Sequence, residues 1–356
     1  MFTWREISSD WLGGTTTCGE HDAIIDAFNR VERVLGRPWM NWRWGAIRGV
    51  AATLEVVRTG ALLKGLDGVS DSERLVDGIR RGDRSLIAEA EAIRLVLRLD
   101  PTAQVELEPE IQSGRRPDFR VRRPGEGWVY VEVTSPEKSD AQRRVEAAIE
   151  RLVNAPEATE TTRFAIEVFL AREPDDLDVA RIEQALLALQ GLAESDKVDL
   201  EDGLGTIFYE PTATAEFVVD DHGRDPVPRL STIGFAGIGD DVLRRIAVRI
   251  PFADGRAEVF LATEARQLPM GEPTLIMVQL GRAAGGWRSW EPALRRRFQR
   301  NQHTRVGAVC LFGTAITPND EGPLVMADEA RIVENPHAST GLPGWLTSGL
   351  ARFAGH

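Results

Sequence analysis

The sequence predicts an α/β protein in which a mixed β-sheet is flanked by helices. Two observations predict this class. From residue 70 to residue 190 the expected elements follow the order α-β-β-β-α-β-α. The expected strands show alternation or short apolar runs, whereas the helices show an apolar stripe at 3.6-residue spacing. Such an order is typical of a sheet covered by helices. We expect an additional helical region before this core and extra strands in the C-terminal half.

Composition places the chain among ordinary soluble globular proteins. Its 356 residues are 42% hydrophobic and 28% charged, which suits one large domain or two smaller ones. The net charge of −12 argues against loose nucleic-acid binding by the whole surface, because phosphate contacts need clustered Lys and Arg. A local basic patch stays compatible with that charge.

Cysteine usage and hydropathy indicate the compartment. Cys18 and Cys310 are too few for a disulfide scaffold and do not have metal-site spacing. The first residues lack the basic and apolar regions of a signal peptide, and no apolar run is long enough to cross a bilayer. We therefore expect a cytoplasmic protein without a membrane partner.

The first 75 residues are expected to be helical. Apolar residues at helical spacing predict a helix over 21–36, and a second helix is expected over 45–63. Trp39, Trp42 and Trp44 lie between them. Such a cluster suits either a stacking platform for bases or sugars or a packing corner of the core. Core packing is the favoured interpretation.

The central elements carry the residues of interest. Helices are predicted over 72–82 and 85–99, and Pro101 ends the second one. Strands are predicted over 104–111, 117–121 and 128–135, the last two joined by the turn-rich segment RRPGEG. A helix over 136–153, a strand over 162–171 and a helix over 175–192 follow.

Short strands dominate the remaining chain. We expect strands over 206–211, 215–220, 231–238, 244–252, 274–281 and 306–316, and helices over 257–269, 290–302 and 341–353. The resulting domain prediction is a helical region over 1–75 and an α/β domain over 76–356. A β-rich insertion is expected around 200–255 within that domain.

Two acidic residues lie on the predicted hairpin. Asp118 follows Pro117 at the start of one strand, and Glu132 lies in the next. Side chains alternate along a strand, so the valines at 129, 131 and 133 share one face and Glu132 shares the other with Thr134. Carboxylates on adjacent strands can share a divalent ion, and Mg²⁺ prefers oxygen ligands. A metal held there could activate water for phosphoryl chemistry.

The order of a Glu-bearing helix, a strand, Pro117-Asp118 and a strand with Glu132 resembles the PD-(D/E)XK nuclease superfamily, across roughly residues 85–171. The resemblance implies a restriction-endonuclease-like core and a site for Mg²⁺ or Mn²⁺. It implies Asp118 and Glu132 as metal ligands, completed by Glu91 or Glu89. Sequence spacing favours Glu91 and the apolar stripe favours Glu89, so both stay candidates.

The chain departs from the motif at one position. Thr134 occupies the place of the motif lysine, and threonine cannot supply a positive charge. Lys138, near the start of the next predicted helix, is the nearest replacement for positioning or activating water. Gln267, before a buried strand, matches a glutamine that some members of the superfamily carry.

Each acid also has a structural interpretation. Asp118 could cap backbone amides in a turn after Pro117. Glu132 could pair across the strands with Arg120 or Arg122. These roles would have to coincide with the helix acids to explain the whole pattern.

Basic residues suggest nucleic-acid contacts. Five arginines flank the predicted hairpin: Arg115, Arg116, Arg120, Arg122 and Arg123. A second basic run, which includes Arg296 and Arg300, lies near Trp287 and Trp290. They fit phosphate contacts in a nuclease groove. A solvated helix face is the favoured interpretation of the second run, and a charged hairpin tip stays an open alternative for the first. No zinc motif, P-loop or nucleophile elbow occurs in the sequence.

Two functional hypotheses follow. The first is a Mg²⁺- or Mn²⁺-dependent nuclease that hydrolyses phosphodiesters, with DNA as the expected substrate. The second is a catalytically degenerate protein of the same fold that binds nucleic acid or a protein, which includes a second copy of this chain.

Overall fold

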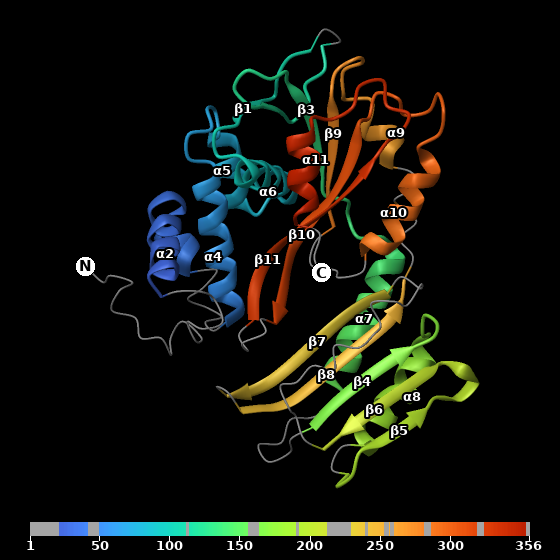
Figure 1. The fold of residues 1–356 in the computed structure, drawn as a ribbon. Coiled ribbons are helices and arrows are strands. Elements are labelled where there is room, and N and C mark those ends of the chain that lie inside the picture. Colours follow the sequence, from blue (N-terminus) through green and yellow to red (C-terminus); the bar gives the residue numbers. More distant parts are fainter. Residues whose placement is uncertain are drawn as a thin grey trace. The chain divides into compact units, whose positions relative to one another are not determined.

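The computed structural model describes residues 21–41, 50–111, 114–155, 164–189, 192–211, 229–238, 241–252, 256, 260–280, 286–318 and 324–353. The chain divides into two compact units. Unit 1 comprises residues 1–136, 258–282 and 293–356, and unit 2 comprises residues 137–257 and 283–292. Each unit has its own sheet, shown in Figure 1.

Unit 1 is built on a six-stranded mixed sheet in the order β1-β2-β3-β9-β10-β11. The strands are β1 (Gln104–Leu107), β2 (Phe119–Arg122), β3 (Val129–Thr134), β9 (Thr274–Gln279), β10 (Ala308–Pro318) and β11 (Leu324–Glu334). The first three form an antiparallel meander, β9 is parallel to β3 and to β10, and β11 returns antiparallel.

Helices of unit 1 precede, interrupt and follow this sheet. They are α2 (His21–Leu35), α3 (Arg37–Met40), α4 (Val50–Gly65), α5 (Glu73–Arg81), α6 (Arg84–Leu99), α9 (Phe260–Glu264) and α11 (Gly344–Ala351). Helix α10 (Gly286–Arg297) crosses the division between the units.

The joint between α5 and α6 fixes the helix that carries the candidate glutamates. Gly82 ends α5 in the left-handed conformation, at φ 74°. Asp83 then caps α6, because its side chain accepts hydrogen bonds from the backbone N–H groups of Ser85 and Leu86. Gly78 on α5 permits close packing, since a Cβ there would lie 2.4 Å from Leu86 Cβ.

The core of unit 1 lies between α6 and alternate residues of the sheet. Ile93 and Val96 of α6 share a buried cluster with Val129 and Val131 of β3. Val133 packs against the same cluster. Glu132 therefore points to the opposite face of β3, which confirms the alternation predicted from the sequence.

Unit 2 has a five-stranded sheet in the order β5-β6-β4-β8-β7. Its elements are α7 (Asp140–Asn154), β4 (Phe164–Leu170), α8 (Asp176–Leu189), β5 (Asp196–Asp199), the 3-10 turn η4 (Glu201–Gly203), β6 (Gly205–Glu210), β7 (Arg229–Ile238) and β8 (Asp241–Pro251). The apolar faces of α7 and α8 pack on β4, β6 and β8.

The structure confirms the predicted α/β class with mixed sheets flanked by helices. The chain contains two sheets, and strands that are neighbours in the sequence belong to different ones. Strand β4 pairs with β6 and β8 in the sheet of unit 2, whereas β9 lies beside β3 in the sheet of unit 1. The second unit accordingly begins at Glu137 rather than near residue 200, and α2–α6 belong to the same unit as the six-stranded sheet.

Other predictions have mixed outcomes. Helix α9 is shorter than expected, and β5 and β11 were not predicted. The strand expected over 215–220 lies outside the described residues, as do Trp42 and Trp44. Trp39 is buried in the core of unit 1, which agrees with the packing interpretation. No helix in the described part of the chain is long and apolar enough to cross a membrane.

Candidate functional site

Asp118 lies at the entry to β2, where its backbone continues the β1–β2 pairing. The backbone N–H of Glu108 donates to the Asp118 carbonyl at 2.8 Å. The side chain does not cap its own turn. Its Oδ2 accepts a 2.7 Å hydrogen bond from the backbone N–H of Val133 in β3. The carboxylate is therefore held against β3, one residue from Glu132.

Glu132 has the most strongly perturbed carboxyl group of the site. Burial and then the charge of Asp118 raise its pKa to about 9, with smaller contributions from Glu264 and Glu89. Its Oε2 is buried and has no hydrogen-bond partner. The predicted alternative role, an ion pair with Arg120 or Arg122, is wrong: Arg120 pairs with Glu106, and Arg122 donates to Gln104.

Glu89, on α6, interacts electrostatically with Asp118. Burial and the charge of Asp118 raise its pKa to about 7, although a hydrogen bond from Arg74 opposes this shift. Arg74 Nη2 lies 2.6 Å from Glu89 Oε1, and its Nε lies 3.2 Å from Glu108 Oε1. Arg74 is thus the cationic side chain set among these carboxylates.

Glu264 is a further member that sequence reasoning missed. It is the last residue of α9, and burial followed by the charge of Asp118 raises its pKa. The sequence analysis selected Gln267 from the same segment, and no motif marked Glu264 as a site residue. We refer to Glu89, Asp118, Glu132 and Glu264 as the acidic cluster, because the charge of Asp118 raises the pKa of each of the other three.

Glu91 is occupied elsewhere. Its Oε1 accepts hydrogen bonds from Arg58, one of them from Nε at 2.6 Å, and its Oε2 accepts one from Gln279 Nε2. Gln279 Oε1 in turn accepts a 3.0 Å hydrogen bond from Ser135. For Glu89, by contrast, the charge of Asp118 raises the pKa of the carboxyl group.

The remaining predicted catalytic residues are dispersed. Thr134 lies two residues after Glu132 on β3, opposite Val278 of β9. Gln267 is exposed in the turn after α9. Lys138 belongs to unit 2, where its ammonium group pairs with Glu146.

The predicted nucleic-acid contacts fall at two places in unit 1. Arg115 donates a hydrogen bond to the carbonyl of Arg266, and Arg116 lies 3.9 Å from Glu110 with most of its side chain exposed. Arg296 is exposed near the end of α10, and Arg300 is exposed just after it.

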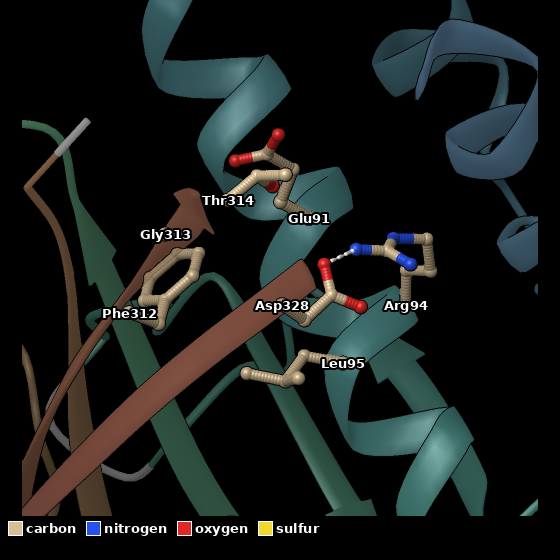
Figure 2. Close-up of a pocket in the computed structure, with 7 residues that line it drawn as sticks. All are labelled: Glu91, Arg94, Leu95, Phe312, Gly313, Thr314 and Asp328. Atoms are coloured by element: carbon tan, nitrogen blue, oxygen red, sulfur yellow. Dashed lines mark hydrogen bonds and ion pairs between the residues drawn. The ribbon is translucent and has the colours of Figure 1, made fainter. Parts of the chain in front are cut away.

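A small pocket opens beside Glu91, on the α6 side of the sheet. Figure 2 shows Glu91 and the ion pair between Arg94 and Asp328 at its wall. Its free volume is about 10 Å³, room for about one water molecule. None of the acidic cluster lines it, so this pocket is not the candidate site.

The donor chemistry of the acidic cluster fits a hard divalent cation. Its ligand atoms are carboxylate oxygens, and the buried Glu132 Oε2 lacks a partner. In the described part of the chain, no three His, Cys, Asp or Glu side chains already converge at metal-ligand spacing. Mg²⁺ needs only one or two protein carboxylates, with waters or substrate completing its shell. Asp118 and Glu132 can meet that requirement.

Comparisons with known proteins found no matching family model, no matching curated protein and no matching solved structure.

Proposed function

We propose that this protein is a divalent-metal-dependent phosphodiesterase, a nuclease with DNA as its expected substrate. The observation that carries the proposal is the placement of Asp118 and Glu132 next to one another, with the Asp118 carboxylate hydrogen-bonded to the backbone N–H of Val133. The pKa of both carboxyl groups is raised by burial, and the charge of Asp118 raises that of Glu132 further. Strongly perturbed acids gathered in one place are typical of functional sites, because catalytic groups need pKa values matched to their task.

The order of elements supports the same proposal. Helix α6 with Glu89 precedes an antiparallel meander that carries Asp118 and Glu132, as the superfamily resemblance implies. The strand that follows next to β3 is β9 rather than β4, with unit 2 inserted between them in the sequence. An insertion at that point leaves the meander and its acids unchanged.

The residues of the chain have distinct roles in this proposal. Asp118 and Glu132 would hold Mg²⁺ or Mn²⁺, and Glu89 or Glu264 would bind one of its water ligands. The bound metal would supply a Lewis acid for the phosphoryl oxygen and a water of lowered pKa. Arg74 holds Glu89 in place and limits the repulsion within the cluster. Thr134, Gln267 and Lys138 stay predictions as residues that position water.

The decisive experiment combines binding with turnover. Calorimetric titration with Mn²⁺ at pH 8 should show binding to the wild-type chain, and Asp118→Asn and Glu132→Gln should each lose it. The same variants should lose Mn²⁺-dependent cleavage of labelled DNA and of bis(p-nitrophenyl) phosphate. Glu110→Gln is the matched control, because Glu110 is exposed and outside the cluster. Wild-type activity in Asp118→Asn would refute the proposal.

A binding module without catalysis is the second candidate. It is favoured by Thr134, which leaves strand β3 without the motif lysine. Mn²⁺ binding that depends on Asp118, together with DNA binding but no turnover of either substrate, would support this candidate.

A further inference from the structure

The outer face of the β1–β2–β3 meander carries three cross-strand rows of polar and aromatic side chains. The strand register pairs Gln104 with Arg122 and Glu106 with Arg120, and it pairs Arg120 with Tyr130. Because strands alternate their side chains, the same face continues to Trp128 at one end. At the other end it reaches Glu108, Asp118 and Glu132.

The rows differ in charge. The row of Gln104, Arg122 and Trp128 has one cation, and Arg122 donates to the Gln104 amide oxygen at 2.9 Å rather than to a carboxylate. In the middle row Arg120 is neutralised by Glu106, with Nη2 and Oε2 2.6 Å apart. The last row is acidic, and Arg74 is its cationic neighbour. The face is therefore positive at the hairpin end and negative at the cluster end.

Planar groups line the positive end. The guanidinium carbons of Arg120 and Arg122 both lie 4.3 Å from the centroid of the Trp128 ring. Arg120 also lies 5.9 Å from the centroid of the Tyr130 ring and 3.4 Å from its hydroxyl oxygen. Trp128, Tyr130 and Arg122 are all partly exposed. Guanidinium and aromatic planes are the surfaces on which unpaired bases stack.

We propose that this face binds a single-stranded nucleic acid, whose backbone phosphate pairs with Arg122 and whose bases stack on the Arg120–Trp128–Arg122 group. The inference rests on the proposed function in one respect, which is that the bound strand runs from the hairpin toward the acidic cluster. Trp128 and Glu132 are four residues apart on one strand, roughly 13 Å at about 3.3 Å per residue. That length corresponds to a few nucleotides between the phosphate at Arg122 and the one at the cluster.

Arg120 and Arg122 belong to the basic residues that the sequence predicts around the hairpin, and the structure adds that both lie against Trp128. Arg115 and Arg116 precede the hairpin, and Arg296 and Arg300 lie at the end of α10. The hairpin face joins phosphate binding and stacking in one group, and it is continuous with the row of Asp118 and Glu132.

Fluorescence anisotropy of the full chain with labelled oligo(dT), in EDTA and 50 mM salt, tests the proposal. Arg122→Gln should weaken binding and lower the slope of log affinity against log salt concentration by about 0.7, the value for one phosphate contact to a single strand. Trp128→Leu should weaken binding about tenfold, as expected for the loss of one stacked base. Arg81→Gln, an exposed arginine on α5, is the matched control and should bind as wild type.

Three outcomes would overturn the proposal: no oligo(dT) binding by the wild-type chain, equal binding by Arg122→Gln and Arg81→Gln, or a duplex bound as tightly as the single strand. Thermal unfolding of each variant separates lost contacts from lost structure. Mn²⁺-dependent hydrolysis of bis(p-nitrophenyl) phosphate should persist in Arg81→Gln. If the wild-type chain lacks that hydrolysis while oligo(dT) binding depends on Arg122, the proposed function fails and this surface stands.

Discussion

The Asp118 carboxylate accepts a hydrogen bond from the backbone N–H of Val133, with Oδ2 and N 2.7 Å apart. This contact joins the entry of β2 to β3 at the residue next to Glu132. Bringing two buried carboxylates together raises the free energy of their ionised forms. The fold nevertheless holds Asp118 in place through a backbone donor. This hydrogen bond opposes the rise in the pKa of Asp118 that burial causes, and so favours the ionised form that a cation could neutralise.

The first prediction concerns stability and pH. The raised pKa of Glu132, about 9, means that the folded state keeps a proton which the unfolded state loses near pH 4.5. The contribution of Glu132 to the unfolding free energy should therefore be highest below about pH 4.5 to 5. It should fall as pH rises toward 9, by up to about 1.4 kcal/mol per pH unit for one proton. Urea unfolding at pH 6, 7, 8 and 9 measures this slope.

The control for this prediction is the neutral isostere. Glu132→Gln should flatten the slope between pH 7 and 9, whereas Glu110→Gln should keep it. Millimolar Mn²⁺ should also flatten it in the wild-type chain, because a metal and a proton compete for the same oxygens. A wild-type slope unchanged by Glu132→Gln would show that Glu132 is not the group that titrates.

The second prediction separates the two helix glutamates. Glu91→Gln should destabilise the chain by about 1–3 kcal/mol, because it removes the anion that Arg58 and Gln279 contact. Glu89→Gln should cost less than about 1 kcal/mol at pH 7, where a carboxyl with a pKa of about 7 is already half protonated. Urea unfolding provides the free energies.

Mn²⁺ titration of the same two variants completes the comparison. Mn²⁺ binding should weaken in Glu89→Gln. It should persist in Glu91→Gln, measured at a temperature at which that variant is folded. Weakened binding in Glu91→Gln alone would assign the site to the other glutamate.

The third prediction concerns Arg74. Removing its charge should raise the pKa of Glu89 and Asp118 further, since Arg74 lowers both. Arg74→Gln should therefore bind Mn²⁺ more weakly than wild type at pH 6, where protons compete. At pH 9 fewer protons compete with the metal, and the variant lacks the Arg74 guanidinium that repels it. The variant should therefore bind Mn²⁺ several-fold more tightly than wild type. Calorimetry at both pH values tests for this crossover.

The matched control is Arg80→Gln, because Arg80 lies on the same helix and pairs with the exposed Asp77. It should follow the wild-type affinity at both pH values. Identical affinities for Arg74→Gln and wild type at pH 6 and pH 9 would place Arg74 outside the site.

Local pattern made some of this site predictable. Alternation along β3 was enough to separate the buried valines from Glu132, and Pro117 marked the start of β2 beside Asp118. The roles of Glu89 and Glu91 could not be separated, because both are buried on α6 and the difference lies in Arg74 and Arg58, which come from other helices. Glu264 was missed for a similar reason. Unit 2 separates it from β3 in the sequence, and only the pairing of β9 with β3 brings its chain segment back to the site.

The last prediction concerns the join between α6 and β11, which supports the helix that carries Glu89. Asp328 is largely buried and accepts hydrogen bonds from both Arg94 and Arg98. Asp328→Asn should destabilise the chain by about 2 kcal/mol, because Arg94 would keep a poorly solvated charge without its anion, while the exposed Arg98 loses little. Asp77→Asn, which breaks the exposed pair with Arg80, should cost less than about 0.5 kcal/mol. Equal unfolding free energies for the two variants would mean that Asp328 does not secure α6 to β11.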